Sequence, residues 1–215
     1  MSDLRGFNQN LTPGRNSGWG AIRRTADGAL YIAEHVRALS IEGRIFGAHF
    51  GTLTTPLATA ATTAITTLRP MAWLRVPDGT AIIPLTVNLL VESAGATTQG
   101  EALLGIATSD VGNGTSSAGT SGALGVSLNS AAPISSTVIP RQLATADVSA
   151  DYALELKRFS FAASAVNQDF SWQAAQELVP SVLRGAATLM LYIGGNAVNF
   201  YCQMQWIELP ESAVS

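Results

Sequence analysis

Glycine and proline interrupt this chain so often that its apolar segments are short. The sequence holds 20 Gly and 9 Pro in 215 residues. The clearest segment is residues 69–92, in which an apolar run at 69–76, a Pro-Asp-Gly-Thr turn at 77–80 and a second apolar run at 81–92 predict strand, turn and strand. Short strands separated by turns, with little helix, predict an all-β fold, a jelly-roll-like antiparallel β-sandwich.

The first 25 residues differ from the rest of the chain. They are rich in Asn, Gly and Arg, and their large apolar residues, among them Phe7 and Trp19, follow neither a two-residue nor a 3.6-residue period. A segment of this composition cannot form a core of its own. We therefore divide the chain into an extended N-terminal arm, residues 1–25, and one β-sandwich domain, residues 26–215.

Further strands are expected on both sides of the 69–92 block. Apolar and β-branched residues predict strands at 29–34, 37–50 and 101–108. Near the C-terminus, residues 182–193 and 197–209 flank Gly194-Gly195-Asn196, which predicts a final hairpin.

Several positions indicate irregular structure. Pro84 lies inside an expected strand, so that strand is an edge strand or carries a bulge there. In residues 152–161 the apolar positions change parity, which also indicates a bulge. The Ala/Thr tract at 52–67 is expected to be extended or a loop, and residues 171–178 a short helix or a loop.

Charge and hydropathy argue against nucleic acid and membrane as partners. Charged residues make up 13% of the chain, the net charge is -3, and the Lys and Arg residues are scattered. The most apolar stretch, residues 188–202, is divided by Gly194-Gly195-Asn196 and is shorter than the roughly 20 residues that span a bilayer. The N-terminal sequence lacks the apolar region of a secretory signal, so we expect synthesis in the cytoplasm.

Catalytic, metal and cofactor sites are not predicted. The only histidines, His35 and His49, are expected on strands without a nucleophile motif beside them. Cys202 is the only cysteine, so a disulfide within the chain and a structural zinc site are both excluded, and a buried thiol is expected. The chain has neither a P-loop nor a G-x-G-x-x-G motif. We predict no enzyme activity and no cofactor.

Two weaker candidates for chemistry remain open. Glu92 and Glu101 could face each other across a hairpin as a pair of glycosidase carboxylates, although solvated hairpin ends are the simpler interpretation. The polar loop that begins at Asp110 offers oxygen ligands for a cation but has few carboxylates.

The tryptophans divide into two pairs. Trp73 and Trp206 lie within expected strands and are predicted to be core residues. Trp19 in the arm and Trp172 in an expected connection have no evident place inside the domain. Together with Phe7 they are our candidate interface anchors.

Residues 69–92, RPMAWLRVPDGTAIIPLTVNLLVE, with the Ala/Thr tract before them and the Gly/Ser loop at 110–123 after them, resemble the jelly-roll decoration (cement) proteins of tailed-bacteriophage capsids. The resemblance implies a virion structural protein on the capsid surface, a homotrimer that contacts the major capsid protein. The alternative is a carbohydrate- or receptor-binding β-sandwich of a virion or surface assembly, with Trp172 and the 110–123 loop at a glycan.

Overall fold

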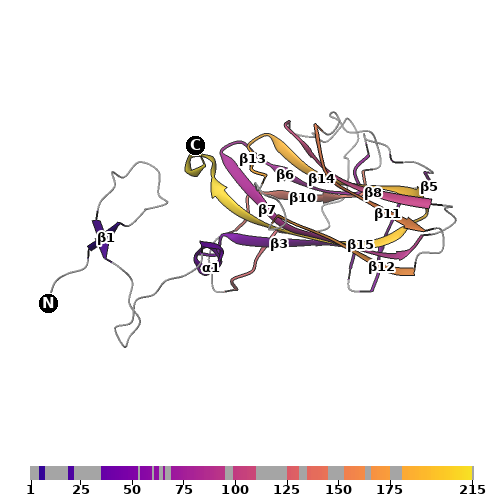
Figure 1. The fold of residues 1–215 in the computed structure, drawn as a ribbon, viewed down its shortest axis with the longest axis horizontal. Helices are drawn as coiled ribbons and strands as arrows, with labels where there is room; N and C mark the ends of the chain where they lie inside the picture. Colours follow the sequence, from indigo (N-terminus) through magenta and orange to yellow (C-terminus); the bar gives the residue numbers. More distant parts are fainter. Residues whose placement is uncertain are drawn as a thin grey trace.

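Two antiparallel β-sheets pack face to face in this protein (Figure 1). The structure is a computed structural model, and it describes residues 5–7, 19–21, 35–52, 54–59, 61–62, 65, 69–94, 99–109, 125–130, 135–144, 153–162, 166–174 and 181–214. Within these residues almost every element is a strand, and the exceptions are one short α-helix and one 3-10 turn. The predicted all-β sandwich is confirmed.

The first layer is a six-stranded sheet whose main path has the order β10-β6-β14-β8-β11. Its strands are β10 (Ile139–Gln142), β6 (Ala72–Val76), β14 (Ala187–Asn196), β8 (Gln99–Ala107) and β11 (Leu154–Ala162), and β5 (Ala61–Thr62) pairs with the end of β14.

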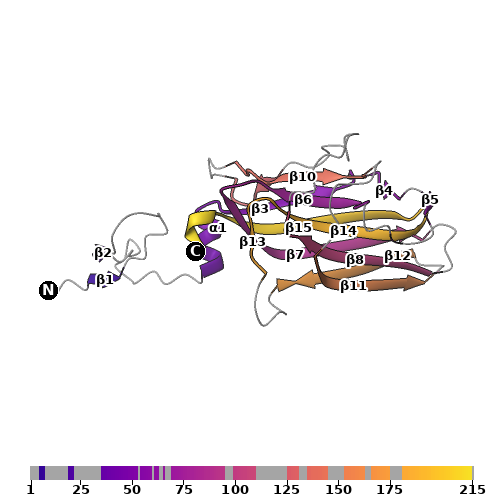
Figure 2. The same cartoon turned by 90° about the horizontal axis from the view of Figure 1, so that it is seen from above.

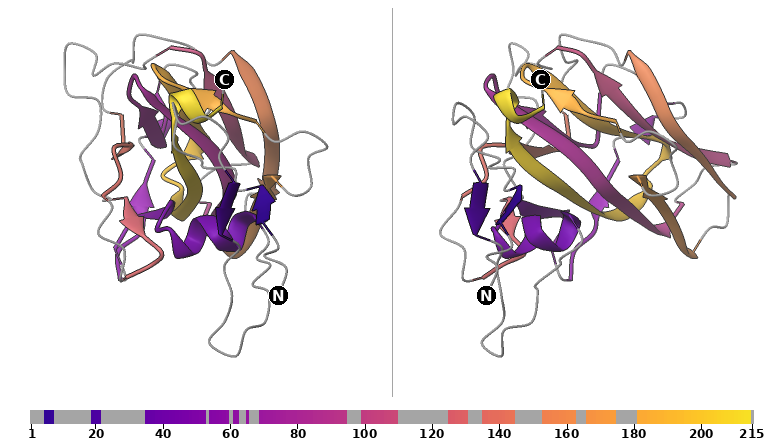
Figure 3. Two further views of the ribbon diagram at one scale, coloured as in Figure 1. Left: turned by 90° about the vertical axis from the view of Figure 1, so that its left-hand side faces the viewer. Right: turned by 60° about the vertical axis from the view of Figure 1, so that its left-hand side comes forward.

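The second layer is a seven-stranded sheet whose main path has the order β12-β7-β15-β3-β9. Its strands are β12 (Val166–Gln173), β7 (Thr80–Ser93), β15 (Asn199–Pro210), β3 (Ile45–Phe50) and β9 (Val126–Ser127), with β13 (Leu183–Arg184) paired to β7 and β4 (Leu57–Ala58) paired to β15. The short strands β9 and β10 lie on one side of the sandwich, and β11 and β12 lie on the other (Figures 2 and 3).

The chain passes from one sheet to the other between β6 and β7, between β7 and β8, between β11 and β12 and between β14 and β15, which makes the sandwich jelly-roll-like. The turn at 77–80 joins β6 of one sheet to β7 of the other, and Gly79 there adopts a φ of 80°. The turn after Asn196 likewise joins β14 to β15 in the opposite sheet. The prediction of a final hairpin was therefore wrong about pairing and about the turn, because Gly194-Gly195-Asn196 belong to β14, although β14 and β15 overlap the two predicted strands.

The main core lies between the sheets. Alternate residues of the long strands fill it, including Leu74, Leu104 and Leu191 from one sheet and Phe46 and Trp206 from the other. Trp73, the neighbour of Leu74, belongs to a second buried cluster together with Leu103, Met190 and Tyr192. Trp73 and Trp206 are both buried, as predicted.

Pro84 is accommodated by a gap and a bulge. Strand β13 pairs with β7 at Ala81 and Ile82, and β12 pairs with β7 only from Thr86 onward, so Pro84 falls between the two partners. On its other side, β15 shifts register between Gln205 and Trp206, which is the pair opposite Thr86 and Pro84. A proline cannot donate to a ladder, so a break in the pairing is where it fits. Of the two predictions for Pro84, an edge strand or a bulge, the bulge is confirmed, because β7 is a central strand of its sheet.

The parity change in β11 also corresponds to a bulge. The ladder with β8 shifts register between Glu155 and Lys157, and beyond it Phe159 and Phe161 are buried. The Ala/Thr tract contributes only the two-residue strands β4 and β5 within the described residues.

Residues 37–41 were expected to be a strand and instead belong to the helix α1 (His35–Ile41). Leu39 is fully buried and packs with Ile45, Ile207 and Leu209, so the helix is held by burying one leucine against the end of the seven-stranded sheet. The 3-10 turn η2 (Glu211–Ala213) follows Pro210 at the same end. The strand expected at 29–34 lies outside the described residues.

Within the predicted arm, two short strands pair with each other. Strands β1 (Arg5–Phe7) and β2 (Trp19–Ala21) form a separate antiparallel two-stranded sheet in which Phe7 and Trp19 are directly opposite partners. The rest of residues 1–25 lies outside the described residues.

Candidate functional site

The outer face of the seven-stranded sheet has a covered end and an open end. At the covered end, outward residues such as Ile207 and Leu209 pack against α1 and the residues of η2. At the open end, Gln203 is exposed and Tyr201 is half-buried, while their neighbours Cys202 and Met204 point into the core.

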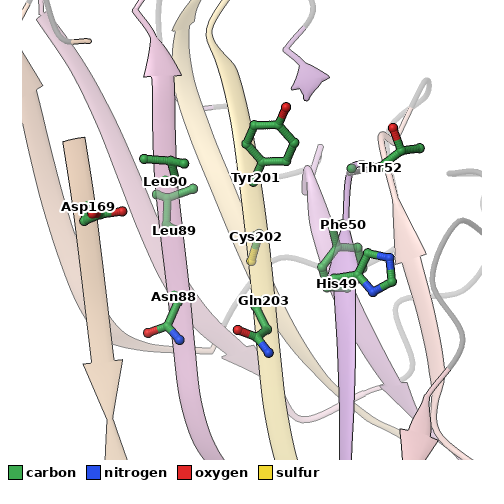
Figure 4. A pocket seen from close by; sticks show the side chains of 11 residues that line it. His49, Phe50, Thr52, Asn88, Leu89, Leu90, Asp169, Tyr201, Cys202 and Gln203 are labelled. Atoms are coloured by element: carbon green, nitrogen blue, oxygen red, sulfur yellow. The ribbon is translucent and has the colours of Figure 1, made fainter. Parts of the chain in front are cut away.

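The open end contains a cavity of about 360 Å³. The residues that line it come from β3, β7, β12, β15 and the segment after β3, and they are His49, Phe50, Gly51, Thr52, Asn88, Leu89, Leu90, Asp169, Tyr201, Cys202 and Gln203 (Figure 4).

Strand register brings the polar residues of the cavity into a row. Gln203 of β15 lies directly opposite His49 of β3 on one side and Asn88 of β7 on the other. Asn88 is in turn opposite Ser171 of β12. Side chains at matching positions of neighbouring strands project from the same face, so these four form one band across the sheet.

The next row is more apolar. Tyr201 lies opposite Leu90, and Leu90 lies opposite Asp169. Tyr201 packs directly against the backbone of Gly51, because a Cβ added to Gly51 would lie 2.9 Å from the tyrosine Cδ1. Gly51 also has a φ of +93°, in the left-handed region that glycine adopts readily. A residue without a side chain therefore allows the ring of Tyr201 to lie at this edge of the cavity.

The polar side chains of the cavity are available to a ligand. Among the described residues, the side chains of His49, Asn88, Asp169 and Gln203 take part in no hydrogen bond or ion pair. All four residues are exposed, whereas Tyr201 is half-buried. Asp169 and His49 are the ionisable groups beside Tyr201 and Cys202, and no Lys or Arg lines the cavity. Burial raises the pKa of the Cys202 thiol, so the thiol stays protonated and unreactive. Cys202 is buried, as predicted.

The residues considered for catalysis do not come together. His49 lies on β3 and is exposed, whereas His35 begins α1, so its expected place on a strand was wrong. Glu92 is the next-to-last residue of β7, and Glu101 lies in β8 of the other sheet, where its carboxylate pairs with Arg158. These two carboxylates are not partners across a hairpin.

In the part of the chain that the structure describes, no three His, Cys, Asp or Glu residues gather as a metal site. No helix of that part is long and apolar enough to cross a membrane. The loop at 110–123 lies outside the described residues.

Trp172 is not an interface anchor. Its indole is 2% exposed and belongs to the core between the sheets, because residues 171–173 continue β12 instead of forming the expected helix or loop. The prediction for Trp172 was wrong because it rested on a helix or loop at residues 171–178, whereas residues 171–173 are strand. Phe7 and Trp19 remain candidate anchors, and the structure gives only their backbone pairing.

A second feature of this face is a set of exposed apolar side chains beside α1. Val36 and Ile41 of α1 are 46% and 51% exposed, and Val126 and Leu128 at β9 are 59% and 51% exposed. The two segments are joined, since the Asn129 side chain donates to the Ile41 carbonyl at 2.9 Å. We call Val36, Ile41, Val126 and Leu128 the helix-edge patch.

Comparison with known proteins gives no assignment. No protein-family model matches the sequence, and searches of curated proteins and of solved structures found no match.

Sequence reasoning missed the polar row. A signal was present, because polar residues recur at every second position at Thr86 and Asn88 and at Gln203 and Gln205. The pattern indicates solvent-facing positions, but only the register between strands places Asn88, Gln203 and His49 side by side.

Proposed function

We propose that this chain is a non-enzymatic structural protein of a phage virion, which decorates the capsid surface and stabilises it through contacts with copies of itself and with the major capsid protein. The observation that carries the proposal is the helix-edge patch, four apolar side chains left exposed on α1 and at β9, two segments that the hydrogen bond from Asn129 to the Ile41 carbonyl joins. Apolar side chains that stay exposed on adjoining segments are typical of protein interfaces. The resemblance of residues 69–92 to decoration proteins supplies the setting.

We assign the helix-edge patch to contacts between copies of this chain, arranged as a homotrimer. The chain has few charges and a net charge of only -3, so repulsion between copies is weak. Burying four half-exposed side chains contributes about 1 kcal/mol each, whereas micromolar association needs about 8 kcal/mol. Further contacts are therefore required, and we place them in the N-terminal arm.

Light scattering on the purified protein tests the trimer. The wild-type chain is expected at three times the mass of one chain, and the double variant Val126→Glu, Leu128→Glu is expected to dissociate. Leu154→Glu is the matched control, because Leu154 is 55% exposed but lies at β11, on the opposite side of the sandwich. A wild-type protein that stays monomeric over a wide concentration range would refute the trimer.

Retention on capsids tests the decoration role. Capsids stripped of this protein are mixed with the wild-type chain and sedimented, and the bound fraction is measured. We expect saturable binding and a rise in the temperature at which the capsids break open. Capsids that neither bind the chain nor gain stability would contradict a decoration function.

A further inference from the structure

We propose that the cavity on the seven-stranded sheet binds a neutral oligosaccharide, with the ring of Tyr201 as a stacking surface and the side chains of Asn88, Gln203, His49 and Asp169 as hydrogen-bonding partners of sugar hydroxyls. This inference does not depend on the decoration role. The cavity lies at the open end of the face, away from α1.

The shape of the site suits an extended ligand. The polar row runs across four strands, from Ser171 through Asn88 and Gln203 to His49. Neighbouring strands are about 4.8 Å apart, so the row spans roughly 14 Å. A linear chain of several sugar rings can lie along a row of this length, whereas a single sugar would contact only part of it.

Tyr201 supplies the apolar contact that sugar rings need. The C–H groups on one face of a pyranose are apolar, and an aromatic ring is a suitable surface for them. The backbone of Gly51 lies close against the tyrosine ring and restricts the positions that the ring can adopt. A ring that is already ordered loses little conformational entropy on binding. In the view of Figure 4, the ring of Tyr201 lies above the side chains of Asn88 and Gln203.

The polar groups match hydroxyls in number and kind. Each amide of Asn88 and Gln203 offers two N–H donors and one carbonyl acceptor, the ring nitrogens of His49 can donate or accept, and the carboxyl oxygens of Asp169 accept. A hydroxyl both donates and accepts, so it can bridge two of these groups. None of the four side chains is engaged by another described residue, and all four are exposed.

The charge of the site selects a neutral sugar. No Lys or Arg lines the cavity, and the one carboxylate there, that of Asp169, would repel sulfate, phosphate or the carboxylate of an acidic sugar. A single carboxylate also falls short of the pair that glycoside hydrolysis requires. We therefore infer binding without cleavage.

Calorimetric titration with defined oligosaccharides tests the proposal. The neutral probes are hexasaccharides of glucose, mannose and N-acetylglucosamine in their common linkages, and the acidic probes are sialyllactose and a heparin hexasaccharide. We expect at least one neutral probe to bind with a Kd between about 10 μM and 1 mM, and both acidic probes to bind more weakly than that probe.

Variants locate the binding to this cavity. Tyr201→Ala and Gln203→Ala are each expected to weaken binding of the neutral probe about tenfold or more, while Tyr201→Phe keeps the ring and most of the affinity. Gln173→Ala is the control, because Gln173 is exposed on β12 of the same sheet but does not line the cavity. Melting curves and light scattering confirm that each variant keeps its fold and oligomeric state.

Three results would overturn the proposal. The first is that no neutral probe binds more tightly than about 10 mM. The second is that an acidic probe binds more tightly than every neutral one. The third is that a neutral probe binds the Tyr201→Ala, Gln203→Ala double variant as well as it binds the wild type.

Discussion

Glu208 holds Thr137 by two hydrogen bonds, since its Oε1 accepts one from the Thr137 amide and one from the Thr137 hydroxyl, each 2.8 Å long. Its Oε2 accepts a third bond from the Ser136 hydroxyl at 2.6 Å. Glu208 belongs to β15 of the seven-stranded sheet, whereas residues 136 and 137 lead into β10 of the other sheet. One carboxylate, 8% exposed, thus ties the two layers together at one side of the sandwich.

Replacing Glu208 is expected to destabilise the fold. In Glu208→Ala the amide and hydroxyl of Thr137 and the hydroxyl of Ser136 lose their acceptor, which costs about 2–4 kcal/mol of unfolding free energy. Urea denaturation of the wild type and the variant measures this difference in unfolding free energy. Glu211→Ala is the control, because the half-buried Glu211 side chain makes no hydrogen bond to another described residue, and it should change stability by less than about 0.5 kcal/mol. Equal effects of the two variants would contradict a special role for Glu208.

Trp172, a core residue, and Trp19, a candidate anchor in the arm, should differ in their effect on the stability of the sandwich. Trp172→Ala removes a core indole that is 2% exposed, so the unfolding free energy should fall by about 3–5 kcal/mol. Trp19→Ala, in the arm, should leave the melting temperature of the sandwich unchanged. A large loss of stability in Trp19→Ala would show that this residue supports the fold and is not an anchor.

The local signals in the sequence predicted more of the fold than the long-range ones did. Proline has no amide donor, so Pro84 marked a break in the ladder before any partner strand was known, and the parity change in β11 marked its bulge. In contrast, Gly194-Gly195-Asn196 has the composition of a hairpin turn, yet these residues end β14, and the chain passes to the other sheet through residues 197 and 198. Turn chemistry indicates that the chain reverses and leaves the partner strands undetermined.

The candidate site was hidden for a similar reason. Asn88 and Gln203 are 115 positions apart, and His49 lies in a third segment, so only the pairing of β7, β15 and β3 brings them together. Helix α1 was missed because its β-branched and apolar residues are shared with strands, and what decides its structure is the burial of Leu39 against Ile207 and Leu209.

Gly51 and Gly79 allow strain and crowding to be separated. Both have φ values in the left-handed region, +93° and +80°, so an alanine at either position strains the backbone by about 1 kcal/mol. At Gly79 nothing lies within 4 Å of the added Cβ, whereas at Gly51 it would meet the ring of Tyr201. We expect Gly51→Ala to melt below Gly79→Ala and, unlike Gly79→Ala, to weaken oligosaccharide binding. If both variants bind the sugar equally, the contact with Gly51 does not position Tyr201.

The exposed edge strand β11 should show a small pH dependence. Arg158 donates to both oxygens of Glu155 and to Glu101, and the hydrogen bond from Arg158 lowers the pKa of Glu155 below its ordinary value of 4.5. A lowered pKa in the folded state means that the contribution is present at neutral pH and disappears as the pH falls below 4.5. Solvent screens these exposed groups, so Arg158→Ala should cost about 0.5 kcal/mol at pH 7 and nearly nothing at low pH. Denaturation curves at both pH values check this, and an equal cost at both would exclude the ion pair as its source.

The proposed role of the N-terminal arm is attachment to a neighbouring molecule. Residues 5–7 and 19–21 form a two-stranded sheet that is separate from both layers of the sandwich, and an isolated two-stranded sheet is marginally stable in water. A neighbouring molecule would supply the missing contacts, with Phe7 and Trp19, the directly opposite partners of this ladder, as anchors.

Deleting residues 2–25 should therefore leave the melting temperature of the sandwich unchanged and weaken retention on capsids by orders of magnitude, because burying one large ring contributes about 2–3 kcal/mol and two rings are lost. Phe7→Ala, Trp19→Ala in the full-length chain should reproduce most of this loss, whereas replacing Asn8 and Asn10 with Ala should not. Retention of the deleted chain equal to that of the full-length chain would refute docking by the arm. A fall in melting temperature would instead show that the arm stabilises its own sandwich.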